Sequence, residues 1–433
     1  MKFFNTLGRT LVEFSPIEPG HARLYTCGPT VYDHVHIGNW RAFLFGDVLR
    51  RALRERGLRV TQVMNLTDVD DKIVAACRRT LTPLGAFTEP FKRAFFEGLD
   101  LLGIERAEHY PEASCHIAEM VDLVLRLRAR GFTYDVEGSV YFRISSFEPY
   151  GRLSGIEGRT LRAGAGGRVQ SDEYAKEDVR DFALWKAWVP QDGEVFWETP
   201  LGKGRPGWHL ECSAMSMKYL GERFDIHTGG IDLCFPHHDN EIAQSEGATG
   251  HPFVNVWMHN AHLSIDGQKM SKSLGNLVLL PALLDKGTDP MAVRLALIST
   301  HYRQPANFSL EGLEGAASSL RRLRDFASRL ERLEGESAGA ADPTLEACER
   351  AFDAAIDDDL NVSLALGALF DMVRIVHRLA DAGEIGRADG LRARDVVGRL
   401  DRVLGLRLLK GEDSPPDADV DRLIEERRAA RAA

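Results

Sequence analysis

The stretch that most constrains the fold is residues 24–45, LYTCGPTVYDHVHIGNWRAFLF. A short apolar run leads into a Gly-Pro turn and a polar loop, and a helical pattern then runs from about Gly38 to a stop at Gly57. When a strand is followed by a glycine-containing turn and the start of a helix, backbone N–H groups and the positive end of the helix dipole can bind a phosphate. We therefore predict a parallel α/β fold with a phosphate site here. Parallel α/β proteins contain several such turns, so this turn alone does not define an activity.

A second predicted strand, LRVTQVMNLT at 58–67, ends in an acidic turn at 68–71. Parallel sheets place ligand sites at the carboxyl ends of their strands, so Cys27 and Thr67 are expected to face one pocket. The alternation of strands and helices is lost at 131–200 and resumes near 203. We expect a Rossmann-like catalytic domain made of residues 1–95 and 200–265, with residues 96–199 as an insertion.

After about residue 300 the composition becomes typical of helices. An apolar stripe is followed by the linker 335–343 and by a predicted helix pair at 344–404. We expect an α-helical bundle domain at 311–410, reached through a connecting region at 266–310. Residues 411–433 are expected to form a linker and a truncated C-terminal helix. The stripe consists of Leu320, Leu323, Phe326, Leu330 and Leu333.

The composition excludes some classes of protein. Hydrophobic residues make up 44% and charged residues 27%, as in ordinary globular proteins, and the net charge of −10 argues mildly against nucleic acid apart from a local basic surface. No apolar run approaches the ~18 residues of a membrane span. The six cysteines are scattered without a CxxC pair, which fits reduced thiols in the cytoplasm.

Four residues are candidates for a metal site. His237 and Glu241 are four apart, which on a helix puts both side chains on one face. With Cys27 and Cys212 they would make a donor set that zinc accepts. The two cysteines lie 185 residues apart, however, and their spacing does not bring them together. Buried free cysteines and a helix-start histidine are the alternative, which spacing alone favours.

A polar loop, DGQKMSKSLGN at 266–276, carries Lys269 and Lys272 among serines and glycines. Two lysines on such a loop suit a polyphosphate that develops charge during a reaction. A solvated turn without a ligand is the other interpretation, and this loop alone does not decide between them.

Taken together, these segments resemble the class I aminoacyl-tRNA synthetases. HIGN at 36–39 is similar to their HIGH signature, and KMSKS at 269–273 matches their second signature letter for letter. The longer segments narrow the resemblance to the cysteinyl-tRNA synthetases, and it covers nearly the whole chain. These segments are CGPTVYDHVHIGN, NLTDVDDKI, GRPGWHLECSAM and FDIHTGGIDLCFPHHDNEIAQSE.

The resemblance implies a set of site residues. It implies one zinc ion per chain, held by Cys27, Cys212, His237 and Glu241. It implies substrate contacts at Thr67, Trp208, His227 and Asp232. It implies that the phosphates of ATP are bound, with Mg²⁺, by His36, Gly38, Asn39 and Lys272, and that the leaving pyrophosphate is neutralised by Lys269 and Lys272. Asn39 stands where the signature has a second histidine, but an amide still donates a hydrogen bond to phosphate.

The resemblance also implies an activity and partners. The chain is expected to activate L-cysteine with ATP and to transfer it to the 3′ end of tRNA(Cys), as a monomer, with zinc selecting the thiol. The helical region would face the RNA, and its basic side chains either contact phosphate or form a solvated face. Members of the family usually continue into a small anticodon-reading domain, whereas this sequence stops at Ala433. The basic residues are Arg321, Arg322, Arg324 and Arg329.

Two alternatives stay open. One is a related ATP-dependent cysteine ligase with an amino-sugar acceptor, which would share the zinc site and both signatures but lack much of the helical end. The other is an inactive tRNA-binding or regulatory relative. The helices out to residue 404 favour the synthetase, and the retained His36, Lys269 and Lys272 favour an active enzyme.

Overall fold

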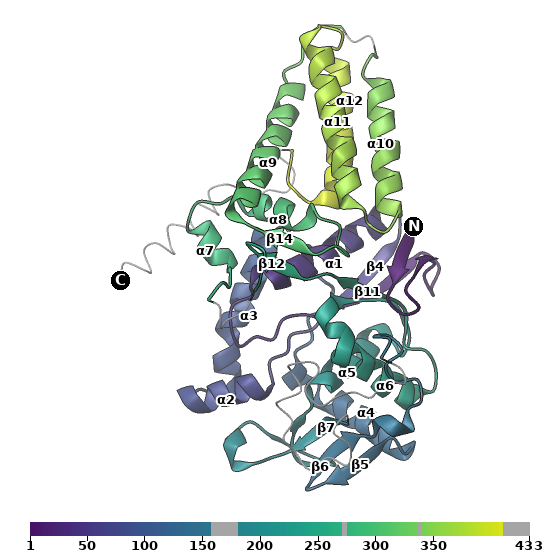
Figure 1. Cartoon of the computed structure of the whole chain (residues 1–433), viewed down its shortest axis with the longest axis vertical. Coiled ribbons are helices and arrows are strands. Elements are labelled where there is room, and N and C mark those ends of the chain that lie inside the picture. The colour runs from purple at the N-terminus through teal and green to yellow at the C-terminus, as the bar shows by residue number, and fades with distance from the viewer. Residues whose placement is uncertain (157–180, 271–274, 337–338, 410–433) are drawn as a thin grey trace.

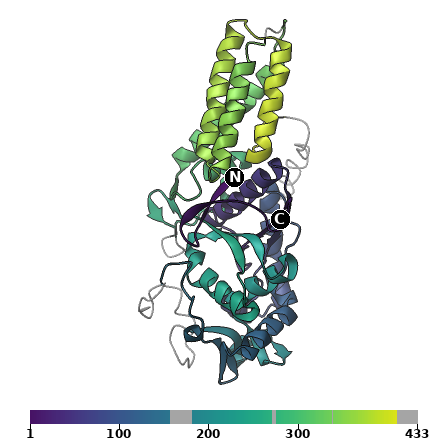
Figure 2. The same cartoon turned by 90° about the vertical axis from the view of Figure 1, so that its right-hand side faces the viewer.

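The computed structural model describes residues 1–156, 181–270, 275–336 and 339–409 (Figure 1). Lys272, the predicted loop at 162–168 and the predicted helix within 411–433 lie outside these residues. A bundle of long helices stands on one end of an α/β body, and the view turned by 90° shows the same elongated arrangement (Figure 2).

A four-stranded parallel sheet forms the centre of the α/β body, with the strand order β11-β10-β3-β4. All three strand pairings are parallel, as expected for strands joined by crossover connections. The prediction of a Rossmann-like parallel sheet is therefore confirmed. The strands are β3 (His21–Thr26), β4 (Arg59–Met64), β10 (Phe224–Gly230) and β11 (Val254–Asn260).

Helix α1 (Ile37–Glu55) connects β3 to β4, as the first stretch of sequence predicts. The side chain of His36 caps its N-terminus by accepting a hydrogen bond from the backbone N–H of Asn39 at 3.3 Å. Gly57 follows with a φ of +80°, a conformation that glycine adopts without steric cost. The apolar face of α1 packs into the main core through Phe45, Val48, Leu49 and Ala52.

The segment that loses the helix–strand alternation contributes to an antiparallel sheet in the order β5-β6-β7-β9-β8. The acidic turn after β4 explains how this sheet attaches to the body. Asp70 caps the N-terminus of α2 (Asp71–Thr80), and the Asp71 carboxylate pairs with Lys186 at 2.9 Å and with Arg205 at 2.6 Å. The strands are β5 (Thr133–Val136), β6 (Ser139–Phe142), β7 (Phe182–Ala187), β8 (Trp197–Thr199) and β9 (Gly202–Pro206).

The other helices of the body surround the two sheets (Figure 1). They are α2 (Asp71–Thr80), α3 (Leu84–Leu101), α4 (Ile117–Ala129), α5 (Trp208–Leu220) and α6 (Asp239–Thr249). A hairpin and a three-stranded sheet complete the strands, which are β1 (Lys2–Asn5), β2 (Thr10–Glu13), β12 (Leu263–Ile265), β13 (Gln268–Lys269) and β14 (Ala306–Phe308). Two short helices, α7 (Leu280–Leu284) and α8 (Pro290–Ile298), lead to the bundle.

The sequence predicts one pair of helices at 344–404. This prediction is wrong, because residues 342–404 contain three helices. The turn at 358–361 lies between the first and the second of these three helices. It contains neither glycine nor proline, so the sequence gives no signal that a helix ends there. The predicted stripe is buried except Leu333, which is half-buried and lies past the end of its helix. The helices are α9 (Leu310–Leu330), α10 (Asp342–Asp357), α11 (Val362–Asp381) and α12 (Arg387–Leu404). Within the described ranges, none of the helices has the length and apolar character needed to cross a membrane.

Arg294 on α8 joins the bundle to the body, and we predict that its removal lowers the stability of the fold. Its fully buried guanidinium donates to the Asp47 carboxylate at 2.6 Å and to the carbonyl of Leu404 at 2.7 Å. Arg294→Ala would leave Asp47 buried with less compensation, so we expect the free energy of unfolding to fall by about 3–5 kcal/mol.

Urea unfolding followed by circular dichroism measures this loss. Arg374→Ala removes an exposed pair with Asp371 and is the matched control, with an expected change below about 1 kcal/mol. Equal unfolding midpoints for the two variants would contradict the structural role of Arg294.

Candidate active site

The structure brings the four predicted metal ligands together. One ligand atom from each of Cys27, Cys212, His237 and Glu241 lies within 4.8 Å of the others, and all four residues are buried. Cys27 directly follows β3, Cys212 lies in α5, and Glu241 lies in the first turn of α6. The fold thus closes the 185-residue gap between the cysteines that spacing alone left open.

The geometry at Glu241 fits a cation. Its Oε1 lies 3.0 Å from Nε2 of His237, as the spacing of four predicts, yet it has no hydrogen-bond partner among the described residues. Helix α6 begins only at Asp239, and a π-helical turn at Cys234–His238 carries His237 onto the same side. Nε2 of His237 and Oε1 of Glu241 are both atoms that bind metals, and they lie close together without a hydrogen bond between them. This arrangement fits an ion bound by both atoms.

The neighbouring side chains hold these groups in place. Nδ1 of His209 lies 2.9 Å from Nδ1 of His237, which leaves Nε2 of His237 to face the cluster. Trp208 stacks on the His237 ring with centroids 4.4 Å apart. Nε2 of His227 lies 3.0 Å from the second oxygen of Glu241. Metal-binding histidines and carboxylates in proteins are usually fixed by second contacts of this kind.

A second set of four residues also meets the distance criterion for a metal site, and it replaces Cys212 and His237 by His227 and His238. The ring of His238 is held in the same way as that of His237, because its Nδ1 lies 2.8 Å from Nε2 of His259, so this contact does not separate the two sets. The first set fits zinc better because it supplies two thiolates, which zinc prefers. Sequence reasoning missed His209, His238 and His259. His238 directly follows His237 and His209 directly follows Trp208, whereas His259 adjoins none of the predicted site residues.

The surroundings shift the pKa values of the cluster residues in different directions. A hydrogen bond with Cys27 is the main reason why the pKa of Cys212 falls to about 6, although burial opposes it. Burial lowers the pKa of His237, but the charges of Cys212 and Glu241 outweigh it and raise that pKa to about 10. Burial raises the pKa of Cys27 well above its ordinary value. Binding of a cation at this point would release the protons held by the His237 imidazolium and the Cys27 thiol.

Two of the predicted substrate residues, Thr67 and Asp232, follow the carboxyl ends of β4 and β10. The Thr67 hydroxyl donates to Glu211 at 2.8 Å, and the Thr67 N–H donates to the carbonyl of Pro29 at 3.0 Å. The carboxyl ends of β3 and β4 therefore meet, as expected from the sequence. Asp232 is exposed just after β10, and its charge is one cause of the raised pKa of Cys27. Glu211 is fully buried, and sequence reasoning missed it.

The two predicted phosphate loops adjoin each other. The N–H of Ile37 donates to the carbonyl of Val278 at 3.0 Å, so the start of α1 pairs with the chain just after the second loop. A Cβ on Gly38 would lie 2.7 Å from the terminal methyl of Met270, so the second loop approaches the start of α1 closely. Asn39 is exposed at the start of α1, and Lys269 is exposed in β13. Both side chains are thus accessible to a ligand.

Comparison with known proteins agrees with this architecture. Residues 13–318 match the family model described as the catalytic domain of tRNA synthetases class I (C), and residues 351–409 match a DALR domain. A cysteine–tRNA ligase of Brachyspira hyodysenteriae is 45% identical over 99% of this chain and 92% of its own length. The chain belongs to the cysteine–tRNA ligase family of class I synthetases.

Other members of the family and more distant synthetases extend the comparison. The cysteine–tRNA ligase of Protochlamydia amoebophila is 45% identical over 100% of this chain and 91% of its own length. A Mycobacterium tuberculosis methionyl-tRNA synthetase in complex with methionyl-adenylate shares the fold, with a TM-score of 0.64 at 17% identity over 89% of this chain and 90% of that one. The family likeness includes the helical end, which the amino-sugar alternative was expected to lack in large part.

Proposed function

We propose that the chain attaches L-cysteine to the 3′ end of tRNA(Cys) in the cytoplasm. The reaction would run through ATP-dependent formation of cysteinyl-adenylate, with zinc selecting the thiol. The observation that carries this proposal is the buried cluster of two cysteines, a histidine and a glutamate at the carboxyl ends of parallel strands. The family membership supports the choice of cysteine and of tRNA.

Activation requires no nucleophile from the protein, because the substrate carboxylate attacks the α-phosphate of ATP. The protein supplies alignment and charge. The backbone N–H groups at the start of α1, together with His36 and Asn39, would bind the phosphates. Lys269 and Lys272 would neutralise the departing pyrophosphate with Mg²⁺.

Selection of cysteine over serine is the difficult part of the task, since the two differ by one atom. A pocket that reads only shape gains about 1–3 kcal/mol from so small a change. Zinc, when bound, supplies a soft Lewis acid that favours a thiolate over a hydroxyl. Cys27, Cys212, His237 and Glu241 would hold it. Thr67, Trp208, His227 and Asp232 would surround the rest of the amino acid.

Cysteine-dependent ATP–pyrophosphate exchange by the purified chain tests this proposal. We expect exchange with cysteine and at least a thousandfold less with serine at equal concentration. Exchange with serine at a comparable rate, or with a different amino acid in place of cysteine, would refute the assignment.

His209 supplies a finer test of the metal assignment. Because it holds the far nitrogen of the His237 ring at 2.9 Å, His209→Ala should weaken zinc binding by about 10–100-fold. Competition with a zinc chelator measures this affinity. His251→Ala, at an exposed histidine, is the control and should leave zinc affinity unchanged. Unchanged affinity in both variants would argue against His237 as a ligand.

RNA contact on α9 is proposed for two of the four predicted arginines. Arg321 and Arg322 are exposed. Arg324 instead pairs with Asp289 at 2.5 Å, and Arg329 pairs with Asp381 at 2.5 Å. A side chain already paired with a carboxylate gains less from a phosphate, so Arg321 and Arg322 are the stronger candidates.

A further inference from the structure

The buried carboxylate of Asp359 is one of the groups that link the helical bundle to the α/β body. Asp359 lies in the turn between α10 and α11 and is 2% exposed. Its Oδ1 accepts hydrogen bonds from the N–H of Phe4 at 2.8 Å and from the hydroxyl of Tyr302 at 2.5 Å. Its Oδ2 accepts one from Nε of Arg303 at 2.6 Å. One side chain of the bundle therefore binds two separate segments outside it.

The backbone of this turn adopts an unusual conformation that places the carboxylate inside. Asp359 has a φ of +61° and Leu360 a φ of +53°, a left-handed region that residues other than glycine rarely enter. The N–H of Asp359 also donates to the carbonyl of Lys2 at 3.0 Å. Strained residues persist only where the surrounding structure holds them, and they gather at functional positions.

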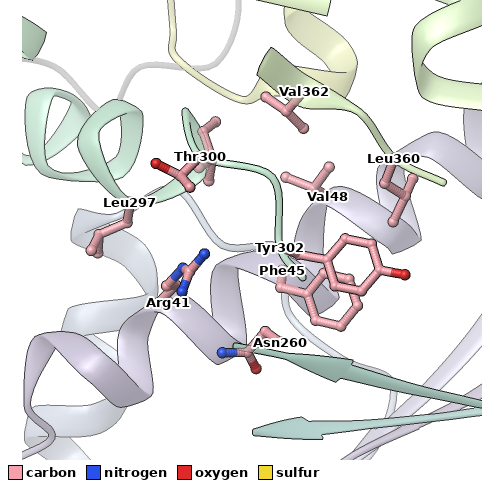
Figure 3. A pocket seen from close by; sticks show the side chains of 10 residues that line it. Arg41, Phe45, Val48, Asn260, Leu297, Thr300, Tyr302, Leu360 and Val362 are labelled. Atoms are coloured by element: carbon pink, nitrogen blue, oxygen red, sulfur yellow. The ribbon is translucent and has the colours of Figure 1, made fainter. Parts of the chain in front are cut away.

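One partner of Asp359, Tyr302, contacts helix α1. The Tyr302 ring stacks on Phe45 of α1 with centroids 4.4 Å apart, and Arg41 of the same helix lies nearby (Figure 3). A cavity of about 20 Å³ lies among these side chains, with Leu360 and Val362 on the bundle side. The Arg41 guanidinium donates to the backbone carbonyls of Ala261, His262, His301 and Gln304.

Arg41 thus ties the helix that begins with the phosphate signature to two further segments. Ala261 and His262 come just before β12, which leads into the second signature loop, and His301 and Gln304 flank Tyr302. Asp359 therefore contacts the same segment, residues 301–304, that Arg41 of α1 binds.

We propose that Asp359 is a positioning residue that fixes the helical bundle against the body and thereby aligns bound tRNA with the adenylate. The inference rests on the proposed function and extends it. Helix α9 has 21 residues and is about 30 Å long, so a rotation of about 10° at the junction moves its far end about 5 Å. A tRNA held by the displaced bundle would present its acceptor end out of line with the adenylate, which would suppress transfer.

The same arrangement predicts different effects on the two half-reactions, which are the activation of cysteine and its transfer to tRNA. The residues proposed to bind cysteine and ATP all belong to the body, so activation is not expected to depend on the angle of the bundle. Transfer requires one tRNA to contact both parts at once. Loss of the Asp359 contacts should therefore impair charging selectively.

Two variants and a matched control test the inference on the full chain. Asp359→Asn weakens the bond to Arg303 and Tyr302→Phe removes one donor, so the second variant is the milder. Asp371→Asn makes the same chemical change on α11 at an exposed residue that pairs only with Arg374 at 3.1 Å among the described ion pairs. Pyrophosphate exchange and tRNA charging are measured on the same preparations, with thermal unfolding alongside.

We expect exchange within twofold of the unaltered chain for all three variants. For Asp359→Asn, kcat/KM for charging should fall at least tenfold, mainly through a lower kcat, and for Tyr302→Phe by a smaller factor. Asp371→Asn should leave charging unchanged. The ratio of charging to exchange does not depend on the folded fraction, so a purely structural role would not move it.

Equal losses of exchange and charging in Asp359→Asn and Tyr302→Phe would overturn the inference, as would unchanged charging in both. Exchange without tRNA charging by the unaltered chain would instead refute the proposed acceptor. The two failures are therefore distinguishable.

Discussion

Cys212→Ala is expected to lower cysteine-dependent pyrophosphate exchange at least a thousandfold and to abolish the preference for cysteine over serine. The thiol of Cys212 is buried in the cluster, and its pKa is lowered to about 6 by the hydrogen bond with Cys27. Its loss removes one of two sulfur donors, so zinc binding should fail. A thousandfold loss corresponds to about 4 kcal/mol of transition-state stabilisation.

Zinc content by mass spectrometry and exchange with cysteine and serine check this result together. Cys348→Ala is the matched control, because it also removes a buried thiol but lies in α10 of the bundle. It should keep one zinc per chain and full discrimination. A Cys212→Ala protein that still discriminated against serine would show that zinc is not the specificity element.

Lys272→Ala is expected to lower the rate of adenylate formation by a factor of about 100 to 1,000 and to leave the dissociation constant for cysteine within twofold. Lys272 lies outside the described residues, but its neighbour Met270 contacts Gly38 at the start of α1. A lysine at this position would act on charge that develops on pyrophosphate, which exists only as the reaction proceeds.

Single-turnover kinetics separates the chemical step from substrate binding. Lys286→Ala provides the control, because Lys286 is an exposed lysine just after α7 and has no predicted role. We expect this control to react at the normal rate. If Lys272→Ala weakened cysteine binding as much as it slowed the reaction, the proposed transition-state role would be refuted.

Local sequence signals were sufficient for the elements that position the site. The apolar spacing of α1, with His36 before it and Gly57 after it, predicts a helix whose observed bounds differ by only a residue or two. The spacing of four between His237 and Glu241 predicts their shared face, which the 3.0 Å contact confirms. Both signals act over one or two helical turns, where periodicity is informative.

Long-range encounters could not be predicted in the same way. That Cys27 meets Cys212 depends on how α5 packs beside the end of β3, and only the family resemblance indicated it. The break before α11 was missed because Asp359 and Leu360 enter the left-handed region without a glycine. The contacts that stabilise this turn come from Phe4, Tyr302 and Arg303, which lie far away in the sequence.

The most direct test of the central claim is the attachment of radiolabelled cysteine to tRNA(Cys) by the purified chain with ATP, Mg²⁺ and zinc. A parallel reaction offers an amino sugar in place of tRNA. We predict stable cysteinyl-tRNA, no product with the amino sugar, and no charging with serine. Cysteine activation without tRNA charging, accompanied by a cysteine–sugar product, would contradict the account and assign the chain to the other ligase reaction.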